Sequence, residues 1–225
     1  MSGRTIFVGD VHGCREELDA LLVAVRFSTG DRLVLAGDLV ARGPDSRGVL
    51  RLLRTVGARA VRGNHEERLL RWHRARGTKE KIPLGPNHLD LARQLSAEEW
   101  ALLDSLPLWL DLPEHGVRVL HAGVDPTLPF FAQDRETILH VRLVGQPKVL
   151  WASRYLGPEH IVFGHHAMVG LQFHPFATGL DTGCVYGNAL TGLVLDADEP
   201  MPKSETERRA RLVSIRARHA WFPVE

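Results

Sequence analysis

The stretch Thr5-Ile6-Phe7-Val8-Gly9-Asp10-Val11-His12-Gly13 decides the fold of this chain. It begins with four apolar or β-branched residues, a run typical of a buried strand. An aspartate and a histidine follow directly, set between glycines. This order predicts a strand that delivers two polar side chains to the edge of a sheet. Ligands of open α/β sheets bind at the carboxyl ends of strands, so Asp10 and His12 are candidate site residues.

Four further motifs repeat the arrangement along the chain, most of them after an apolar segment. They are Gly37-Asp38-Leu39-Val40-Ala41-Arg42-Gly43, Gly63-Asn64-His65-Glu66, His121-Ala122-Gly123 and Gly164-His165-His166. We expect their polar side chains to converge at the same edge. Carboxylate, amide and imidazole groups in this number are typical ligands of divalent metal ions.

The spacing of these residues favours two ions rather than one. Asp10 and His12 lie two residues apart after one strand, so both can face the same ion. Asp38 can bridge two ions through its two carboxylate oxygens. Asn64, His121 and His165 would then complete the second ion. Two ions about 3.5–4 Å apart can clamp a phosphoryl group and activate a water for in-line attack.

Two residues of the motifs are candidates for chemistry beyond metal binding. His65 follows Asn64 and would point into the same cleft, where it could protonate a leaving oxygen. Arg42 offers a guanidinium fork for phosphate oxygens. Histidines outside the motifs are expected to be structural: His73, His88, His115, His140, His160, His174 and His219.

Composition limits the remaining possibilities. The 225 residues are 44% apolar and 24% charged, which predicts one globular domain spanning 1–225. The formal net charge of +1 leaves no global field to attract DNA or a membrane surface. No apolar run approaches 18 residues and no leader opens the chain, so a cytoplasmic protein is expected. Cys14 and Cys184 are expected to be buried, reduced thiols, with a redox pair as the alternative.

The order of elements predicts an α/β fold. Helices are expected over 14–27 and 45–56, and from Asn64 through Trp72, each after a strand of a parallel sheet. Residues 77–113 are expected to form a helical insertion without a strand, bordering the substrate cleft. Ser96-Ala97-Glu98-Glu99 within it is a capping box that opens a helix.

The last third of the chain is expected to return to strands. A hairpin is predicted over 177–196, with Tyr186-Gly187-Asn188 as its turn. Residues 200–209 are polar and are expected to form a surface connection, and 213–221 to form a terminal edge strand.

In order and spacing, the five motifs resemble those of the PPP-type calcineurin-like metallophosphoesterases. That family includes protein serine/threonine phosphatases and the bacterial symmetrical bis(5'-nucleosyl)-tetraphosphatases. The resemblance spans residues 6–196 and includes the late segment Gly179-Leu180-Asp181-Thr182-Gly183-Cys184-Val185-Tyr186-Gly187. It implies a β-sandwich flanked by helices, a dinuclear metal centre and direct attack by a bridging hydroxide.

The resemblance also implies roles for individual residues. One ion would be held by Asp10, His12 and Asp38, and the other by Asp38, Asn64, His121 and His165. The ions implied are Mn²⁺ first, with Fe, Zn, Ni, Co or Mg as alternatives. His65 would be the general acid and Arg42 a phosphate clamp, with Asn64 also contacting phosphate. A second phosphate-binding arginine is expected, with Arg142 as the candidate and Arg135 and Arg154 as alternatives.

One departure from the family pattern bears on the substrate. Protein phosphatases carry an aspartate before the arginine of the second motif, and here that residue is Ala41. This favours a dinucleoside polyphosphate, chiefly diadenosine tetraphosphate split into two ADP, with a tetraphosphate-capped RNA end as a related substrate. Glu66 is instead common in protein phosphatases, so a phosphoprotein phosphatase is the alternative. Another small-molecule phosphoesterase and a non-enzymatic scaffold are the remaining readings.

The sequence shows no platform for a nucleobase. Aromatic residues at helical spacing are more often part of a core than of a stacking site. That expectation applies to Trp72, Trp100, Trp109, Phe130 and Phe131.

Overall fold

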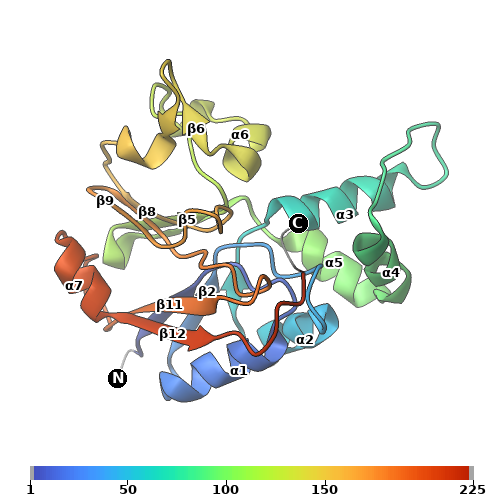
Figure 1. The fold of residues 1–225 in the computed structure, drawn as a ribbon, viewed down its shortest axis with the longest axis horizontal. Helices are drawn as coiled ribbons and strands as arrows, with labels where there is room; N and C mark the ends of the chain where they lie inside the picture. The colour runs from blue at the N-terminus through green and yellow to red at the C-terminus, as the bar shows by residue number, and fades with distance from the viewer. Residues whose placement is uncertain (1–2, 223–225) are drawn as a thin grey trace.

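The computed structural model describes residues 3–222 and contains two five-stranded sheets flanked by helices (Figure 1). The first sheet has the strand order β12-β11-β1-β2-β3. Its strands are β1 (Thr5–Val8), β2 (Arg32–Leu35), β3 (Arg59–Ala60), β11 (Ala189–Leu195) and β12 (Leu212–Arg216). Neighbouring strands of the set β1, β2 and β3 are parallel, whereas β11 runs antiparallel to both β1 and β12.

The second sheet has the order β4-β5-β8-β10-β9. Its strands are β4 (Trp109–Leu112), β5 (Val117–Leu120), β8 (His160–Phe163), β9 (Gln172–His174) and β10 (Ala177–Gly179). The three central strands β5, β8 and β10 are parallel, and the two edge strands are antiparallel to their neighbours. Each sheet therefore has a set of parallel strands whose carboxyl ends can carry site residues.

The helices flank the sheets and border one end of them. In Figure 1, α1 and α2 lie below the first sheet, while α3, α4 and α5 form a lobe to one side. The helices are α1 (Arg15–Ala24), α2 (Ser46–Val56), α3 (Asn64–Ala75), α4 (Pro86–Gln94), α5 (Ala97–Ser105), α6 (Arg135–His140) and α7 (Glu205–Ala210). A two-stranded ribbon of β6 (Leu143–Val144) and β7 (Val149–Leu150) follows α6, and 3₁₀ turns occur at Pro113–His115, Phe130–Ala132 and Trp151–Ser153.

The two sheets are held together by a dry layer of side chains between them. Phe7 and Val34 of the first sheet pack in one cluster with Val119 and Val162 of the second, and none of the four is exposed. Burying a side chain of this size contributes about 1.5–3 kcal/mol each. A second cluster places α1 and α2 against the other face of the first sheet. The strand ends are thus fixed by burial on both sides.

The predicted fold class is confirmed. The three strand–helix units at the start of the chain are present, as is the helix that Ser96 and Glu99 cap reciprocally. The predicted edge strand near the end of the chain is β12, which ends at Arg216 rather than at 221. Within residues 3–222, no helix is long and apolar enough to cross a membrane.

Three predictions about the chain path were wrong. The insertion 77–113 does contain a strand, β4, which pairs with β5 as an edge of the second sheet. Residues 177–196 are not a hairpin, because β10 belongs to the second sheet and β11 to the first. Residues 200–209 are not only a surface connection. Ser204 and Glu207 form a capping box that begins α7, and Arg208 is 2% exposed.

Candidate metal centre

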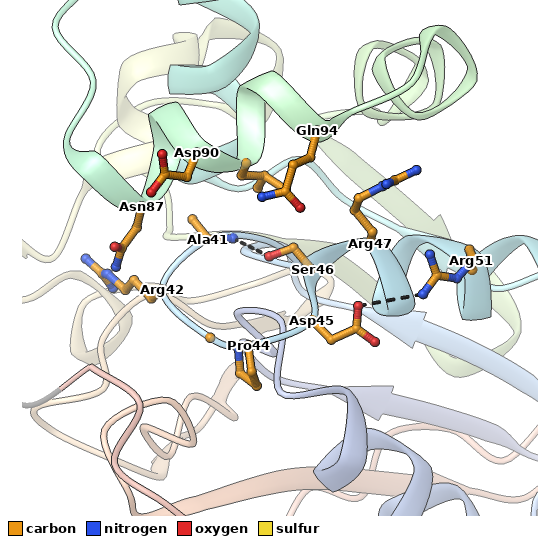
Figure 2. Close-up of a pocket in the computed structure, with 12 residues that line it drawn as sticks. Ala41, Arg42, Pro44, Asp45, Ser46, Arg47, Arg51, Asn87, Asp90 and Gln94 are labelled. Atoms are coloured by element: carbon orange, nitrogen blue, oxygen red, sulfur yellow. Dashed lines mark hydrogen bonds and ion pairs between the residues drawn. The ribbon is translucent and has the colours of Figure 1, made fainter.

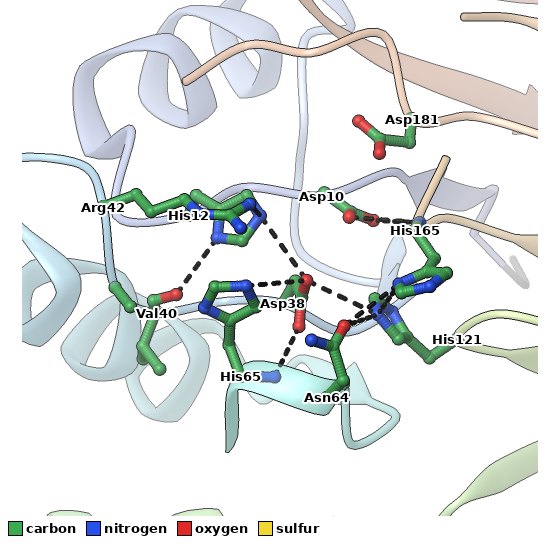
Figure 3. A network of polar contacts seen from close by, with 12 residues as sticks. Asp10, His12, Asp38, Val40, Arg42, Asn64, His65, His121, His165 and Asp181 are labelled. Carbon is green, nitrogen blue, oxygen red and sulfur yellow. Dashed lines mark hydrogen bonds and ion pairs between the residues drawn. The ribbon is translucent and has the colours of Figure 1, made fainter. Parts of the chain in front are cut away.

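The candidate site lies where parallel strands of both sheets end. Asp10 follows β1, Asp38 follows β2 and Asn64 begins α3 after β3. From the second sheet, His121 follows β5 and His165 follows β8. Figure 3 shows these side chains converging on Asp38. The structure thus brings together the six residues that the sequence predicts as metal ligands, His12 included.

The backbone at the site is strained in a way that points to function. Of seven non-glycine residues with positive φ among the described residues, five lie in the motifs. They are His12, Asp38, Ala41, Arg42 and His165. Such conformations cost about 1–3 kcal/mol each and persist only where the surroundings impose them. Gly164 also has a role here, since a Cβ at that position would clash with the carboxylate of Asp10.

Glu66 holds the loop that carries Asp38. Its carboxylate accepts hydrogen bonds from the backbone N–H groups of Asp38, Leu39 and Val40 at 3.0, 2.9 and 3.1 Å. It also accepts from the N–H of Gly63 at 2.8 Å. One fully buried side chain therefore ties the loop after β2 to the start of α3. This explains why the motif contains a glutamate independently of any substrate.

Three atoms that can bind a metal ion lie close together on one side of Asp38. The Nδ1–H of His121 donates to the carbonyl of Ala36 at 2.9 Å, which leaves Nε2 of His121 unprotonated in the neutral ring. That Nε2 lies 2.9 Å from Oδ1 of Asn64 and 3.2 Å from Nδ1 of His165. Nδ1 of His165 is 3.0 Å from the same Oδ1. Potential ligand atoms this close together suit a cation between them.

The other side of Asp38 repeats this chemistry with His12. The Nδ1–H of His12 donates to the carbonyl of Val40 at 3.2 Å, so its Nε2 presents a lone pair. That Nε2 lies 3.4 Å from Oδ2 of Asp38, and Nε2 of His121 lies 3.4 Å from the same oxygen. Asp38 therefore belongs to two donor clusters, His12–Asp38–His65 and Asp38–His121–His165. A carboxylate shared in this way fits a bridge between two ions.

Charge and burial also fit metal binding. Burial lowers the pKa of His12 to about 4 and that of His165 to about 2, so both rings are neutral near pH 7. Neutral imidazole is the form that binds metals. Burial raises the pKa of Asp10 well above its usual range, and that of Asp181 beside it to about 6. Several buried carboxylates around a cavity of about 140 Å³ call for positive charge, which divalent ions would supply.

His65 lines the same cavity, and its backbone N–H is bonded to Asp38. Its N–H donates to Oδ1 of Asp38 at 3.0 Å, and its Nε2 is 3.9 Å from Oδ2 of Asp38. Its ring stacks on His88 of α4, with ring centroids 4.8 Å apart. Nδ1 of His65 is buried and has no hydrogen-bond partner within residues 3–222. Nδ1 of His65 thus has no carboxylate partner among the described residues, and the second motif carries Ala41 rather than an aspartate.

Arg42 points across the mouth of the cavity. Its Nη1 donates to the hydroxyl of Tyr186 at 2.6 Å and to Nε2 of His12 at 3.3 Å. The guanidinium also lies over the rings of Tyr186 and Phe222, 5.6 and 5.3 Å from their centroids. These contacts orient the fork beside the metal ligands, where a phosphate would sit.

The three candidates for a second arginine lie in different places. Arg142 lines the cavity, and its Nη2 donates to the carbonyl of His165 at 3.2 Å. Arg135 instead pairs with Glu67 at 2.9 Å. Arg154 is exposed at the end of a 3₁₀ turn. Of the three, the described lining of the cavity includes only Arg142.

Sequence reasoning missed several residues of the site. Asp181 and Tyr186 line the cavity, and His88 supports His65, although it was expected to be only structural. Asp181 follows β10 as Asp10 follows β1, so the rule of a polar residue after a buried strand could have found it. The five aromatic residues considered as a stacking platform do not line this cavity in the described chain. Cys14 and Cys184 are buried and unbonded, as expected.

Comparisons with known proteins agree with this geometry. The family described as calcineurin-like phosphoesterase matches residues 3–189. A curated asymmetrical bis(5'-nucleosyl)-tetraphosphatase of Oceanobacillus iheyensis is 31% identical over 215 residues, covering 82% of this chain and 85% of the relative. A symmetrical bis(5'-nucleosyl)-tetraphosphatase of Shewanella sp. (strain MR-7) is 38% identical over 191 residues. That match covers 82% of this chain but only 65% of the relative.

Solved structures show the same fold. A crystal structure provisionally named a diadenosine tetraphosphatase superposes with a TM-score of 0.80 at 36% identity. The match covers 96% of this chain and 95% of that one. A serine/threonine phosphatase of Saccharomyces cerevisiae has a TM-score of 0.56 at 17% identity, covering 95% of this chain and 79% of that one. The second similarity shows a shared fold alone.

Proposed function

This chain belongs to the calcineurin-like phosphoesterase family, and on that premise we propose that it hydrolyses dinucleoside tetraphosphates. The proposed reaction is chiefly the splitting of diadenosine tetraphosphate into two ADP. The observation that carries the proposal is the position of Asp38, whose carboxylate belongs to two clusters of metal-ligand atoms. A phosphoanhydride bound there would meet Arg42 and His65 on the same side of that carboxylate (Figure 3).

We assign the two ions to two sets of ligands that share Asp38. One set is Asp10, His12 and Asp38, and the other is Asp38, Asn64, His121 and His165. The mixed oxygen and imidazole donors suit Mn²⁺, with Fe, Zn, Ni, Co and Mg as alternatives. When bound, such ions polarise a phosphoryl group and lower the pKa of a coordinated water.

Side chains of the protein would bind the phosphate and donate the proton. Arg42 of the second motif and Arg142, which follows α6, both border the cavity and would bind phosphate oxygens as guanidinium forks. The side-chain amide of Asn64 would contact the same phosphate. His65 would donate a proton through Nε2 to the departing oxygen, which Arg42 keeps close. A guanidinium that contacts the charge-rich transition state more strongly than the ground state lowers the barrier.

The names of the relatives support a dinucleotide substrate but differ in which phosphoanhydride bond of that substrate is cleaved. Both the asymmetrical and the symmetrical relatives match 82% of this chain. Symmetrical cleavage gives two ADP, whereas asymmetrical cleavage gives ATP and AMP. The asymmetrical relative matches over more of its own length, 85% against 65%, but the aligned region is more similar to the symmetrical relative, 38% against 31% identical, and on that identity we propose two ADP. A tetraphosphate-capped RNA end offers the same anhydride, but none of the relatives compared above is named for one.

A protein serine/threonine phosphatase is the alternative. Glu66 favours it in sequence, but the structure accounts for Glu66 by its four backbone hydrogen bonds. Ala41 and the unsupported Nδ1 of His65 favour a leaving group that needs little proton donation. ADP within a polyphosphate is such a group, and a serine alkoxide is not.

The test is product analysis by anion exchange under manganese. Diadenosine tetraphosphate and a phosphoserine peptide are offered in parallel to the same enzyme. We expect the dinucleotide to be split faster, with ADP as the main product. ATP and AMP in equal amounts would instead assign asymmetrical cleavage. Faster release of phosphate from the peptide would overturn the dinucleotide proposal.

A further inference from the structure

A second cavity adjoins the metal centre through Arg42. It has a volume of about 390 Å³ and lies between α4 on one side and the loop 41–45 with the start of α2 on the other (Figure 2). Small-molecule sites commonly fall between about 300 and 1,000 Å³. Arg42 lines both this cavity, here called the α4 pocket, and the metal centre. A ligand anchored on the metal ions could therefore extend past Arg42 into the α4 pocket.

One face of α4 presents hydrogen-bonding groups to this pocket. Asn87, Asp90 and Gln94 are spaced by three and four residues, which places them on one side of a helix. Figure 2 shows all three near the loop that begins at Ala41. Asp90 contacts Arg93 of the same helix at 3.4 Å, whereas the hydrogen bonds within residues 3–222 include none from the amides of Asn87 or Gln94. The pocket thus offers amide donors and acceptors that other side chains do not use.

The three arginines that line the pocket differ in whether a carboxylate pairs with them. Arg47 is engaged by Glu99 through two contacts of 2.9 Å, and Arg51 lies 3.7 Å from Asp45. Arg42, at the end next to the metal centre, has no carboxylate partner among the described residues. The near end therefore suits a phosphate. The far end, with neutral amides beside Asp90, suits the hydroxyls of a ribose or the edge of a base.

The position of His65 indicates which half of a bound dinucleotide would lie in the α4 pocket. His65 and Arg42 lie on the His12 side of Asp38 (Figure 3). The ring centroids of His65 and His12 are 4.7 Å apart, and Arg42 contacts His12 at 3.3 Å. His88, next to Asn87 in α4, stacks on His65. The oxygen that His65 would protonate thus lies on the Arg42 side of Asp38, and because Arg42 also lines the α4 pocket, the group that leaves with that oxygen can extend into this pocket.

We propose that the α4 pocket binds the nucleoside end of the departing nucleotide, with Asn87 and Gln94 as its specificity-determining contacts. This inference rests on the proposed function, since it needs a substrate whose leaving group is itself a nucleotide. The lining, among the residues described, contains no aromatic side chain, so recognition here relies on hydrogen bonds rather than stacking. A phosphate ester with a small leaving group would reach the metal centre but not these amides.

The test uses the double variant Asn87→Ala/Gln94→Ala, with Lys81→Ala as the matched control. Lys81 is exposed, precedes α4 and does not line the pocket. Loss of two hydrogen bonds should lower the ratio of kcat/KM for diadenosine tetraphosphate to that for p-nitrophenyl phosphate by about tenfold. In the control this ratio should equal that of the wild type. An unchanged ratio in the double variant would overturn the proposal.

Product inhibition gives an independent measurement of the same pocket. ADP and inorganic phosphate are compared as inhibitors of p-nitrophenyl phosphate hydrolysis. The double variant should weaken inhibition by ADP about tenfold and leave inhibition by phosphate at its wild-type value. Equal weakening of both inhibitors would show that the metal centre had been disturbed, and would count against the pocket.

Failure of the pocket and failure of the proposed function give different results. If the wild type does not split the dinucleotide at all but hydrolyses p-nitrophenyl phosphate, the proposed function is wrong. If it splits the dinucleotide and the double variant does so with an unchanged ratio, the function stands and the α4 pocket proposal is wrong.

Discussion

Oδ1 of Asn64 lies 2.9 Å from Nε2 of His121. Burial alone would lower the pKa of His121, but the Asp38 carboxylate outweighs it and raises that pKa, so a proton on Nε2 can join the two atoms as a hydrogen bond. A divalent ion bound by the same two atoms would take the place of that proton. The fold therefore positions Asn64 and His121 for an ion, and buried packing behind the strands holds them there.

Removing the shared carboxylate should affect both ions. We expect two metal ions per chain in the wild type, and a loss at both sites in Asp38→Asn, because the neutral amide is a weaker ligand. Metal analysis of the purified proteins measures this. Asp19→Asn, on an exposed pair with Arg15, is the control and should keep both ions. Full activity of the wild type in excess chelator would exclude a two-metal mechanism.

Removing the proposed acid should affect turnover and not metal content. His65→Asn is expected to lower kcat for diadenosine tetraphosphate by about 10²–10⁴-fold, the usual contribution of general acid catalysis. The loss should be smaller for p-nitrophenyl phosphate, whose leaving group needs little protonation. Steady-state kinetics on both substrates gives the comparison. Equal losses on both would mean that His65 only positions the site.

The two arginines of the cavity should behave alike, and a third should not. Arg42→Ala and Arg142→Ala are each expected to raise KM and lower kcat, because each fork contacts phosphate in the ground and transition states. Arg42→Lys should restore activity only in part, since a point charge cannot replace a bidentate fork. Arg135→Ala is the control, because Arg135 pairs with Glu67 instead. Wild-type kinetics in Arg42→Ala would place that residue outside the phosphate pocket.

The candidate ligands could be predicted from the sequence because their positions depend on local pattern. A buried strand followed by glycine and a polar residue places that residue at the sheet edge, whichever strand is its neighbour. This holds for Asp10, Asp38 and His165. Asp181 also follows a buried strand, β10, but Leu180 stands where the other three have a glycine. The capping box of Ser204 and Glu207 is also a local signal, and it marks the start of α7.

What could not be predicted depends on long-range pairing. The segments of β10 and β11 are both apolar and are separated by turn-forming residues, which is the pattern of a hairpin. In the structure β10 pairs with β8 and β9, and β11 pairs with β1 and β12, and apolar patterning does not distinguish these partners from a pairing of β10 with β11. The α4 pocket is a similar case. Asn87 and Gln94 are ordinary surface residues until the insertion packs beside the loop after Val40.

A part-buried ion pair between Arg4 and Asp31, at the start of β1 and β2 and so at the strand ends away from the site, should make stability depend on pH. The hydrogen bond from Arg4, together with backbone N–H groups, lowers the pKa of Asp31 to about 2, and its side chain is 4% exposed. A lowered folded-state pKa stabilises the protein fully above the unfolded value of about 3.8, and this contribution is lost as the pH falls toward 2. The contribution near pH 7 is about 2 kcal/mol.

Urea unfolding of Asp31→Asn measures this contribution. We expect a loss of about 2 kcal/mol at pH 7 that shrinks as the pH is lowered from 4 toward 2. Asp19→Asn, an exposed pair, should lose less than about 1 kcal/mol. A loss in Asp31→Asn that stays constant over this pH range would mean that the charge of Asp31 is not the cause.

The choice between the two proposed substrate classes depends most on Ala41. In the protein phosphatases that the second motif resembles, an aspartate here accepts a hydrogen bond from the acid histidine. In this chain Nδ1 of His65 is buried without a partner among residues 3–222. Ala41 has a φ of 68°, a conformation that aspartate tolerates better than most residues. The variant Ala41→Asp is therefore compatible with the backbone and could supply the missing acceptor.

A carboxylate at position 41 would stabilise the protonated form of His65 and so improve proton donation to poor leaving groups. A serine alkoxide needs that proton, whereas ADP within a polyphosphate needs it little. Ala41→Asp should therefore raise kcat/KM for a phosphoserine peptide relative to that for diadenosine tetraphosphate, by about tenfold or more. Ala41→Asn is the control, because an amide of equal size cannot supply the charge. If the wild type already hydrolyses the peptide faster, the missing carboxylate does not set the substrate preference.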